Sequence, residues 1–124
     1  MPSLEGMSVL KETSRLFKAL SDETRLRILK MLEIRPLCVC EIQYALKGSQ
    51  PNVSHHLKTL SEAGLVEHRR DGLWVAYRLA DNPETPLHAT MLALVRRLLK
   101  EDSRVTGDQA VIKGIDRVSV SLKK

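Results

Sequence analysis

The hydrophobic pattern of this chain changes its period immediately after Gly64 and changes back at Pro86, which restricts the folds open to it. Before Gly64, apolar residues recur at the three- and four-residue spacings of amphipathic helices. After it, two short extended runs flank Arg70-Asp71-Gly72, and Asp-Gly between two such runs is a strong signal for a β-hairpin. From Pro86 the helical spacing returns. The pattern therefore predicts a mainly α fold with a small β-hairpin (α+β).

The part of the chain before the hairpin carries the end signals of four separate helices. The first is expected at 9–20, and Pro36 ends the second. A short third helix is expected from about 37 to 46, and a turn follows it. Ser49 caps the fourth helix and Gly64 ends it. Two helices joined by a tight turn and followed by a hairpin indicate a winged helix-turn-helix domain, here with the order α-α-α-α-β-β-α.

The helical pattern also suggests how the chain is divided. Residues 1–7 have no pattern and are expected to form a flexible arm, and residues 8–102 are expected to form the winged helix-turn-helix domain. Beyond residue 102 the signal fades. We expect a flexible, basic tail over 103–124, although residues 117–122 alternate weakly, as a short strand would.

Charge and the absence of other signals narrow the class of function. Twenty Lys and Arg against fifteen Asp and Glu leave a net charge of +5, which suits a polyanionic partner such as nucleic acid. No apolar run approaches the ~20 residues of a membrane span and the start is no secretory signal, so we expect a cytoplasmic protein without a membrane partner. The chain has no metal-binding His-x-x-x-His pair, nucleophile elbow or glycine-rich phosphate loop, so we expect no enzyme activity.

The predicted fourth helix has the features of a DNA-reading helix. Its apolar stripe leaves polar side chains that can reach base edges and phosphates on the other faces. The candidate contacts are Ser49, Gln50, Asn52, Ser54, His55, His56 and Lys58. Arg69 and Arg70, beside the hairpin tip, can clamp phosphates or enter a minor groove. The alternatives are a solvated helix face and a charge pair that protects a hairpin edge from aggregation.

The two cysteines of the chain, Cys38 and Cys40, are one residue apart, which makes a disulfide between them strained. They fall at the start of the predicted third helix, where the helix dipole and free N–H groups lower a thiol pKa and favour the thiolate that binds soft ions. Residues i and i+2 of a helix point about 200° apart, so one ion could bind both sulfurs only by distorting the helix. Two core cysteines, buried without a ligand, are the alternative.

Four stretches together resemble the ArsR/SmtB family of bacterial winged helix-turn-helix, metal-responsive repressors. They are 17–29 (FKALSDETRLRIL), 37–42 (LCVCEI), 49–60 (SQPNVSHHLKTL), and 63–66 (AGLV) with the hairpin at 70–72. The second stretch resembles the branch that senses arsenite, antimonite or soft divalent metals at the third helix. The resemblance implies a homodimer formed by the first and last helices, repression of operator DNA, and release when the inducer binds.

The resemblance implies that residues 8–102 are the DNA-binding and dimerisation domain, and it assigns roles to named residues in it. The apolar dimerisation residues are Val9, Leu10, Leu94, Leu98 and Leu99. Cys38 and Cys40 are the expected ligands of arsenite or antimonite, with no cofactor required. Arsenite-sensing relatives carry a third cysteine where this chain has Gln43, so one subunit offers at most two thiolates, which favours a trivalent metalloid over a four-coordinate divalent ion.

Other readings remain open at this point. The same thiols could sense cadmium, lead, zinc or redox state, or the inducer site could have been lost. The family also has a zinc site on its last helix, but this chain offers only His88 there, and His88 is expected to be a polar surface residue.

Overall fold

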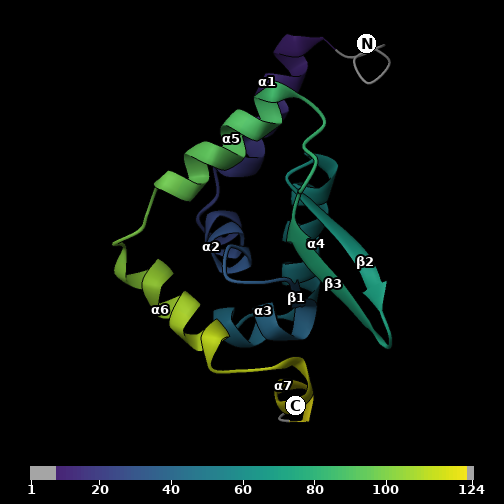
Figure 1. The fold of residues 1–124 in the computed structure, drawn as a ribbon, viewed down its shortest axis with the longest axis vertical. Coiled ribbons are helices and arrows are strands. Elements are labelled where there is room, and N and C mark those ends of the chain that lie inside the picture. The colour runs from purple at the N-terminus through teal and green to yellow at the C-terminus, as the bar shows by residue number, and fades with distance from the viewer. Residues whose placement is uncertain (1–7, 123–124) are drawn as a thin grey trace.

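Four helices precede the hairpin in the computed structural model, which describes residues 8–122 (Figure 1). They are α1 (Val9–Leu20), α2 (Glu23–Leu32), α3 (Val39–Leu46) and α4 (Gln50–Glu62). Three of them begin at a polar cap: the side chains of Ser8, Asp22 and Ser49 each accept a backbone N–H of the first turn. The predicted arm at 1–7 lies outside the described residues.

The predicted hairpin is confirmed, and the structure adds a third strand to it. Strands β2 (Val66–Asp71) and β3 (Trp74–Leu79) form the hairpin, and β1 (Leu37–Cys38) pairs with β3 on its other side. All neighbours are antiparallel, with Leu37 opposite Tyr77 and Cys38 opposite Ala76. Residues 37 and 38 were expected in the third helix. That expectation is wrong, because α3 begins only at Val39.

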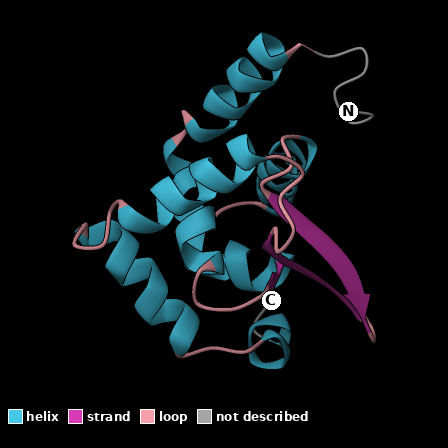
Figure 2. Ribbon diagram, turned by 45° about the horizontal axis from the view of Figure 1, so that its top comes forward, coloured by secondary structure: helices cyan, strands magenta, loops and turns pink. Residues whose placement is uncertain are grey.

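Three helices follow the sheet: α5 (Pro86–Arg97), α6 (Ser103–Lys113) and α7 (Arg117–Leu122). The expectation of a flexible tail is therefore wrong over 103–122, and the weak strand signal at 117–122 is wrong as well (Figure 2). Both oxygens of Asp108 in α6 bind the guanidinium of Arg27 in α2 at 2.8 Å, and Gln109 Nε2 donates to Lys30 O at 2.8 Å. The buried side of α6 includes the charged Asp108, and so α6 has no clear apolar stripe in its sequence.

Aliphatic side chains from α1 to α4 and the sheet form the core around α2. Its fully buried members include Leu16, Ile28, Leu29, Ile42, Val53, Leu57, Leu60 and Leu65. Figure 1 shows α2 lying inside the frame made by α1, α5, α6, α3 and α4. This packing holds α3 and α4 in the helix-turn-helix arrangement and leaves one face of α4 in solvent.

A buried ammonium group ties α2 to the end of α5. Lys30 is 1% exposed, and its Nζ donates to Val95 O at 3.0 Å and pairs with Glu33 Oε2 at 2.8 Å. A buried cation is stable only when it is paired and hydrogen-bonded, and a cation at the carbonyl end of a helix also interacts favourably with the helix dipole. Lys30 thus fixes where α5 ends relative to α2.

His88 in α5 is buried, so the expectation of a surface position is wrong. It is 1% exposed. Its Nδ1 lies 2.7 Å from Thr85 Oγ1, and its Nε2 lies 3.0 Å from Ala63 O and 3.1 Å from Glu12 Oε1. The ring therefore joins α5 to α1 and to the end of α4. The adjacent Gly64 has a φ of +77°, and a Cβ there would meet the ring at 3.0 Å.

Candidate DNA interface and thiol pair

Helix α4 presents a polar face to solvent. Val53, Leu57 and Leu60 are completely buried, as predicted. Gln50, Asn52, His55 and Lys58 are exposed, and Ser54 is half-buried. Ser49 is exposed and caps the helix through Asn52 N, and Gln50 Nε2 donates to Ser54 Oγ at 2.9 Å. The exposed face carries the donors and acceptors that can read base edges.

His56 does not belong to this face. It is 9% exposed, and Arg25 Nη1 donates to its Nδ1 at 3.2 Å. Burial lowers the pKa of His56, against an opposing effect of the nearby Asp22 carboxylate, so the ring is held neutral. Its place among the candidate DNA contacts is therefore wrong. The spacing from Val53 to His56 to Leu60 follows the buried stripe, and that spacing could have revealed the position.

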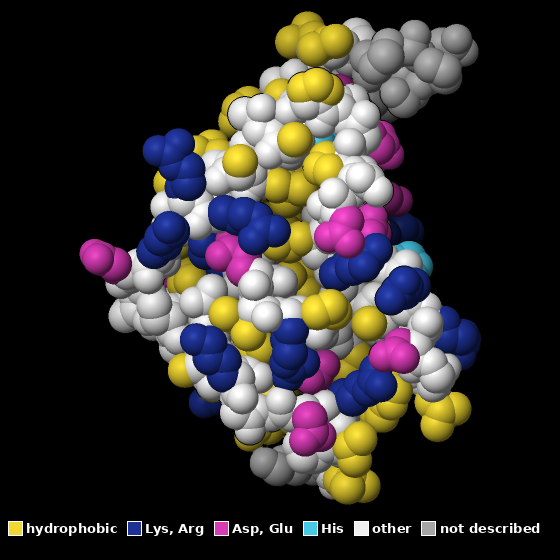
Figure 3. Space-filling view, viewed as in Figure 1, with side chains coloured by type: hydrophobic (Ala, Val, Ile, Leu, Met, Phe, Trp, Pro, Cys, Tyr) yellow, Lys and Arg dark blue, Asp and Glu magenta, His cyan; other side chains and the backbone are white. Residues whose placement is uncertain are grey.

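The hairpin formed by β2 and β3 is the wing. Arg69 and Arg70 are exposed on β2. Arg78 is instead paired with Glu67 at 2.7 Å and with Asp81 at 3.1 Å, so its charge is largely neutralised. In Figure 3, Lys and Arg side chains are spread over the face shown, including the side on which the wing lies. The exposed arginines of the wing are therefore Arg69 and Arg70.

The two cysteines lie where β1 joins α3, and both are free thiols. Cys38 is the last residue of β1 and the cap residue of α3, with extended backbone angles, and Cys40 is in the first turn of α3. The two sulfurs were expected to point about 200° apart on one ideal helix. That expectation is wrong, because Cys38 lies before α3 begins. The two thiols are close neighbours, since Cys40 contributes to the raised pKa of Cys38.

The Cys38 thiol is held in its protonated form. Burial, together with a smaller effect of the neighbouring Cys40, raises its pKa to about 12, although the backbone N–H of Glu41 opposes this rise in part. The expectation that the helix start lowers the thiol pKa is wrong for Cys38, because Cys38 is only 4% exposed and desolvation outweighs the N–H groups. Any ion that binds Cys38 must take a neutral thiol out of a packed site.

Sequence reasoning missed the role of Glu41, which is 2% exposed in the first turn of α3. Its Oε1 accepts the N–H of Cys38 at 3.0 Å, and its Oε2 pairs with Arg35 Nη1 at 2.8 Å. Arg35 also donates to the carbonyls of Ile112 and Ile115, at 3.0 Å and 2.8 Å. A glutamate three residues after a cap is the signal of a capping box, here obscured because the cap is a cysteine.

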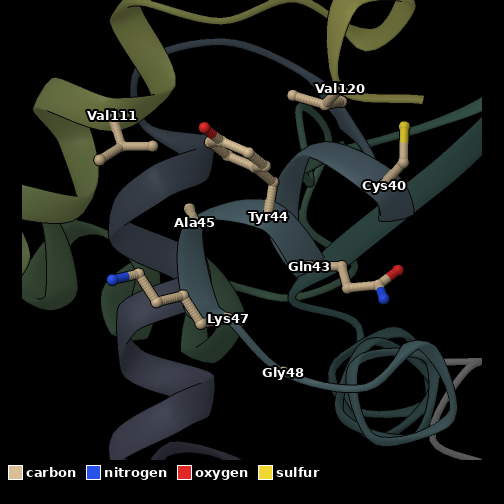
Figure 4. A pocket seen from close by; sticks show the side chains of 8 residues that line it. All are labelled: Cys40, Gln43, Tyr44, Ala45, Lys47, Gly48, Val111 and Val120. Atoms are coloured by element: carbon tan, nitrogen blue, oxygen red, sulfur yellow. The ribbon is translucent and has the colours of Figure 1, made fainter. Parts of the chain in front are cut away.

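A cavity of about 460 Å³ opens beside Cys40, between α3, the turn into α4, and helices α6 and α7 (Figure 4). Tyr44, Lys47 and Gly48 line one side of it, and Val111 and Val120 line the other. Cys40 Sγ lies 4.0 Å from the carbonyl oxygen of Arg117. Among residues 8–122, no three His, Cys, Asp or Glu side chains gather closely enough to hold a metal ion. Within one subunit, the pair is thus the whole set of thiol ligands.

The expected dimerisation residues lie on α1, on α5 and directly after α5. Val9 and Leu10 are exposed on α1, Leu94 is exposed on α5, and Leu98 and Leu99 are exposed directly after α5. Phe17 of α1, which the sequence reasoning missed, is 54% exposed. Figure 3 shows hydrophobic side chains in yellow at the end of the molecule where α1 and α5 lie. A lone small domain seldom leaves such an apolar surface in water.

Similar proteins place the chain in a family. Residues 22–68 match the family model described as bacterial regulatory protein, arsR family. The chain is 42% identical over 102 residues to the arsenic resistance transcriptional regulator ArsR2 of Pseudomonas putida, an alignment that covers 81% of this chain and 85% of that protein. The chain belongs to the arsR family. It is a DNA-binding transcriptional regulator with a winged helix-turn-helix fold.

Two further likenesses agree with this membership. The chain is 48% identical over 79 residues to the arsenical resistance operon repressor of Escherichia coli K12, covering 63% of this chain and 66% of that one. A homodimeric winged helix-turn-helix domain of a possible ArsR-family regulator from Mycobacterium bovis superposes with a TM-score of 0.61 at 34% identity, covering 71% of this chain and 78% of that chain. None of the described helices of this arsR-family regulator is both long and apolar enough to span a bilayer.

Proposed function

We propose that this arsR-family protein is a homodimeric repressor that leaves its operator when arsenite or antimonite binds Cys38 and Cys40. One observation carries the proposal: two free thiols lie at the junction of β1 and α3, and α3 leads through Lys47 and Gly48 into α4. The names of the two bacterial relatives, which refer to arsenic or arsenical resistance, support the choice of inducer.

The DNA half of the proposal rests on the exposed polar face of α4 and on the wing. In this proposal the exposed Asn52 and His55 contact base edges, while the exposed Arg69 and Arg70 bind phosphates. A dimer would present two α4 helices to successive major grooves. The operator should then be an imperfect inverted repeat, with half-sites one or more helical turns apart.

The sensing half rests on the chemistry of two neighbouring cysteine thiols. Arsenous acid and two thiols exchange two As–O bonds for two As–S bonds and release two molecules of water, so the step needs no oxidant or reductant. Cys38 caps α3 and pairs with Ala76 of β3, and so a sulfur drawn into a new bond disturbs both elements. Inducer and operator then oppose each other by one shared coupling energy, typically about 1–3 kcal/mol.

Soft divalent ions and oxidants are the second candidates for the same thiols. Zinc and similar ions take four ligands, and the described part of one chain supplies no cluster of three. A disulfide between residues one apart is strained, so oxidation would first yield a sulfenic acid or a bond between subunits. A trivalent metalloid that takes two thiolates and one hydroxide fits the pair better.

The test is operator release, followed by fluorescence anisotropy and titrated with arsenite. Wild type should be released, whereas the double variant Cys38→Ser, Cys40→Ser should bind the operator and ignore arsenite. Ala45→Ser, which adds a hydroxyl to the same helix without changing a thiol, should respond like wild type. Equal release of wild type and the double variant would exclude the thiol site. Release by cadmium, zinc or peroxide, but not by arsenite, would keep the thiols and replace the inducer.

A further inference from the structure

Arg117, the first residue of α7, contacts both strands of the wing near its tip. Its Nη1 lies 2.9 Å from Asp71 Oδ2 at the end of β2. Its Cζ lies 5.4 Å from the centre of the Trp74 ring at the start of β3. The guanidinium therefore holds an anion on one strand and an aromatic ring on the next.

The tip of the wing has little other support. Strand β1 pairs with β3 only at Ala76 and Tyr77. Trp74 and Val75 therefore pair with β2 on one edge, and among the described residues no strand pairs with them on the other edge. Leu73, between the strands, is 93% exposed. The contacts from Arg117 thus brace the part of the hairpin that carries Arg69 and Arg70.

The same helix lies over the sensing thiol. The carbonyl oxygen of Arg117 is 4.0 Å from Cys40 Sγ, and the buried Val120 lines the cavity that Cys40 faces. In Figure 4 the Cys40 side chain extends toward the side of the cavity where Val120 lies. Helix α7 has six residues, far too few to be stable without its tertiary contacts. A change at Cys40 therefore acts on an element that is easily displaced.

We propose that Arg117 is a positioning residue for the wing and that an inducer bound at Cys40 displaces α7, so that the wing loses its brace. This inference rests on the proposed function, because it assigns a second route by which the same thiols control DNA binding. When the sulfur bonds to arsenic, it loses the hydrogen that it can share with the Arg117 carbonyl, and a larger atom enters the space at the end of α7. Residues 117–122 lie outside the segment that matches the family model.

The chain has one tryptophan, Trp74, and its fluorescence reports directly on the Arg117 contact. Arsenite should change the emission of wild type and leave that of Cys38→Ser, Cys40→Ser unchanged. Arg117→Gln should show an altered emission without arsenite and no further change with it. Arg104→Gln is the matched control: it removes the same charge from an exposed position on α6 and should behave as wild type.

Operator affinity gives the second measurement. Arg117→Gln should weaken operator binding by about three- to tenfold relative to Arg104→Gln, the size expected when one cation–π contact and one exposed ion pair are lost. Arg117→Lys keeps the charge but loses the planar stacking, and should fall between the two. Arsenite should then weaken the Arg117→Gln complex by a smaller factor than it weakens wild type.

The two proposals fail in different ways. If arsenite releases wild type while Trp74 emission stays constant, or if Arg117→Gln matches Arg104→Gln in both measurements, this inference is overturned and the proposed function stands. If wild type shows neither release nor a change of emission, both proposals are overturned. An emission change with arsenite that also occurs in Cys38→Ser, Cys40→Ser would contradict the role of the thiols.

Discussion

Arg25 in α2 donates a hydrogen bond from Nη1 to Nδ1 of His56 in α4, across 3.2 Å. The same guanidinium donates to Ala19 O at 2.8 Å and to Lys18 O at 3.0 Å, at the end of α1. One side chain thus satisfies carbonyls at the end of α1 and holds a histidine on the buried side of α4.

Replacement of Arg25 should therefore loosen both helices. We expect Arg25→Ala to lower the free energy of unfolding by about 2–3 kcal/mol, the scale of hydrogen bonds from a charged donor. Chemical denaturation measures this, with the exposed Lys11→Ala as a control that should stay within about 0.5 kcal/mol of wild type. A loss for Arg25→Ala no larger than that of the control would contradict the role given to Arg25.

The lowered pKa of His56 predicts a loss of stability in mild acid. Burial disfavours the imidazolium, so the unfolded chain takes up a proton at a higher pH than the folded one. The contribution is complete above about pH 6.5, the ordinary value, and declines as the pH falls toward the lower folded value. His56→Asn, which keeps an acceptor for Arg25, should lose less stability between pH 7 and pH 5 than wild type. Identical pH profiles would count against a buried neutral imidazole.

The raised pKa of Cys38 predicts an effect at the other end of the pH scale. The folded state keeps this thiol neutral up to about pH 12, whereas the unfolded chain ionises near 9.0. The resulting stability is complete below the unfolded value and is lost as the pH rises through this window. Between pH 9 and pH 11, wild type should lose about 1–3 kcal/mol more than Cys38→Ser, measured by urea unfolding. Parallel losses in both proteins would show that Cys38 ionises freely.

Two glycines with positive φ offer a matched test of the packing around His88. Gly64 and Gly72 have φ values of +77° and +63°, but only at Gly64 would a Cβ meet another group, the His88 ring at 3.0 Å. Gly72→Ala should lower the free energy of unfolding by about 1 kcal/mol, because alanine is strained in the left-handed backbone conformation. Gly64→Ala should lower it by the same amount and by about 1–3 kcal/mol more, because of the close contact with the ring. Thermal unfolding compares them. Equal costs would mean that the ring moves aside freely.

The proposed dimer is tested at Leu94, which is 45% exposed on α5. Leu94→Lys places a charge within the proposed apolar interface, so it should shift the protein to monomers and weaken operator binding. Sedimentation equilibrium at micromolar concentration measures the change. Leu73→Lys, at the exposed wing tip, is the control that should leave the oligomeric state unaltered. A wild-type protein that sediments only as a ~14 kDa species would overturn the dimer proposal.

Local signals made the winged helix-turn-helix domain predictable from the sequence. Ser49 and Gly64 mark the ends of α4, and Asp71-Gly72 marks the hairpin, because caps and tight turns depend on residues close together in the chain. Strand β1 could not be predicted, since two residues show no alternation and their partners lie about forty positions away.

The same limit explains the larger errors. Helix α6 is held by the pair of Arg27 with Asp108, which are 81 residues apart in sequence, and its polar buried face resembles that of a solvated segment. His56 and His88 were placed at the surface because histidine is often exposed. Each is buried by a partner from another helix, Arg25 in one case and Glu12 in the other.

The buried Lys30 has a consequence for the spacing of the operator half-sites that the proposed dimer can bind. In the proposed homodimer the α5 helices meet, and the two α4 helices must arrive at half-sites a fixed number of base pairs apart. Lys30 joins α2 to the carbonyl end of α5, so it sets the angle between the pairing surface and the reading surface. In this dimer Lys30 therefore fixes the distance between the half-sites, and a relative with another residue at this position is expected to recognise the same bases at a different spacing.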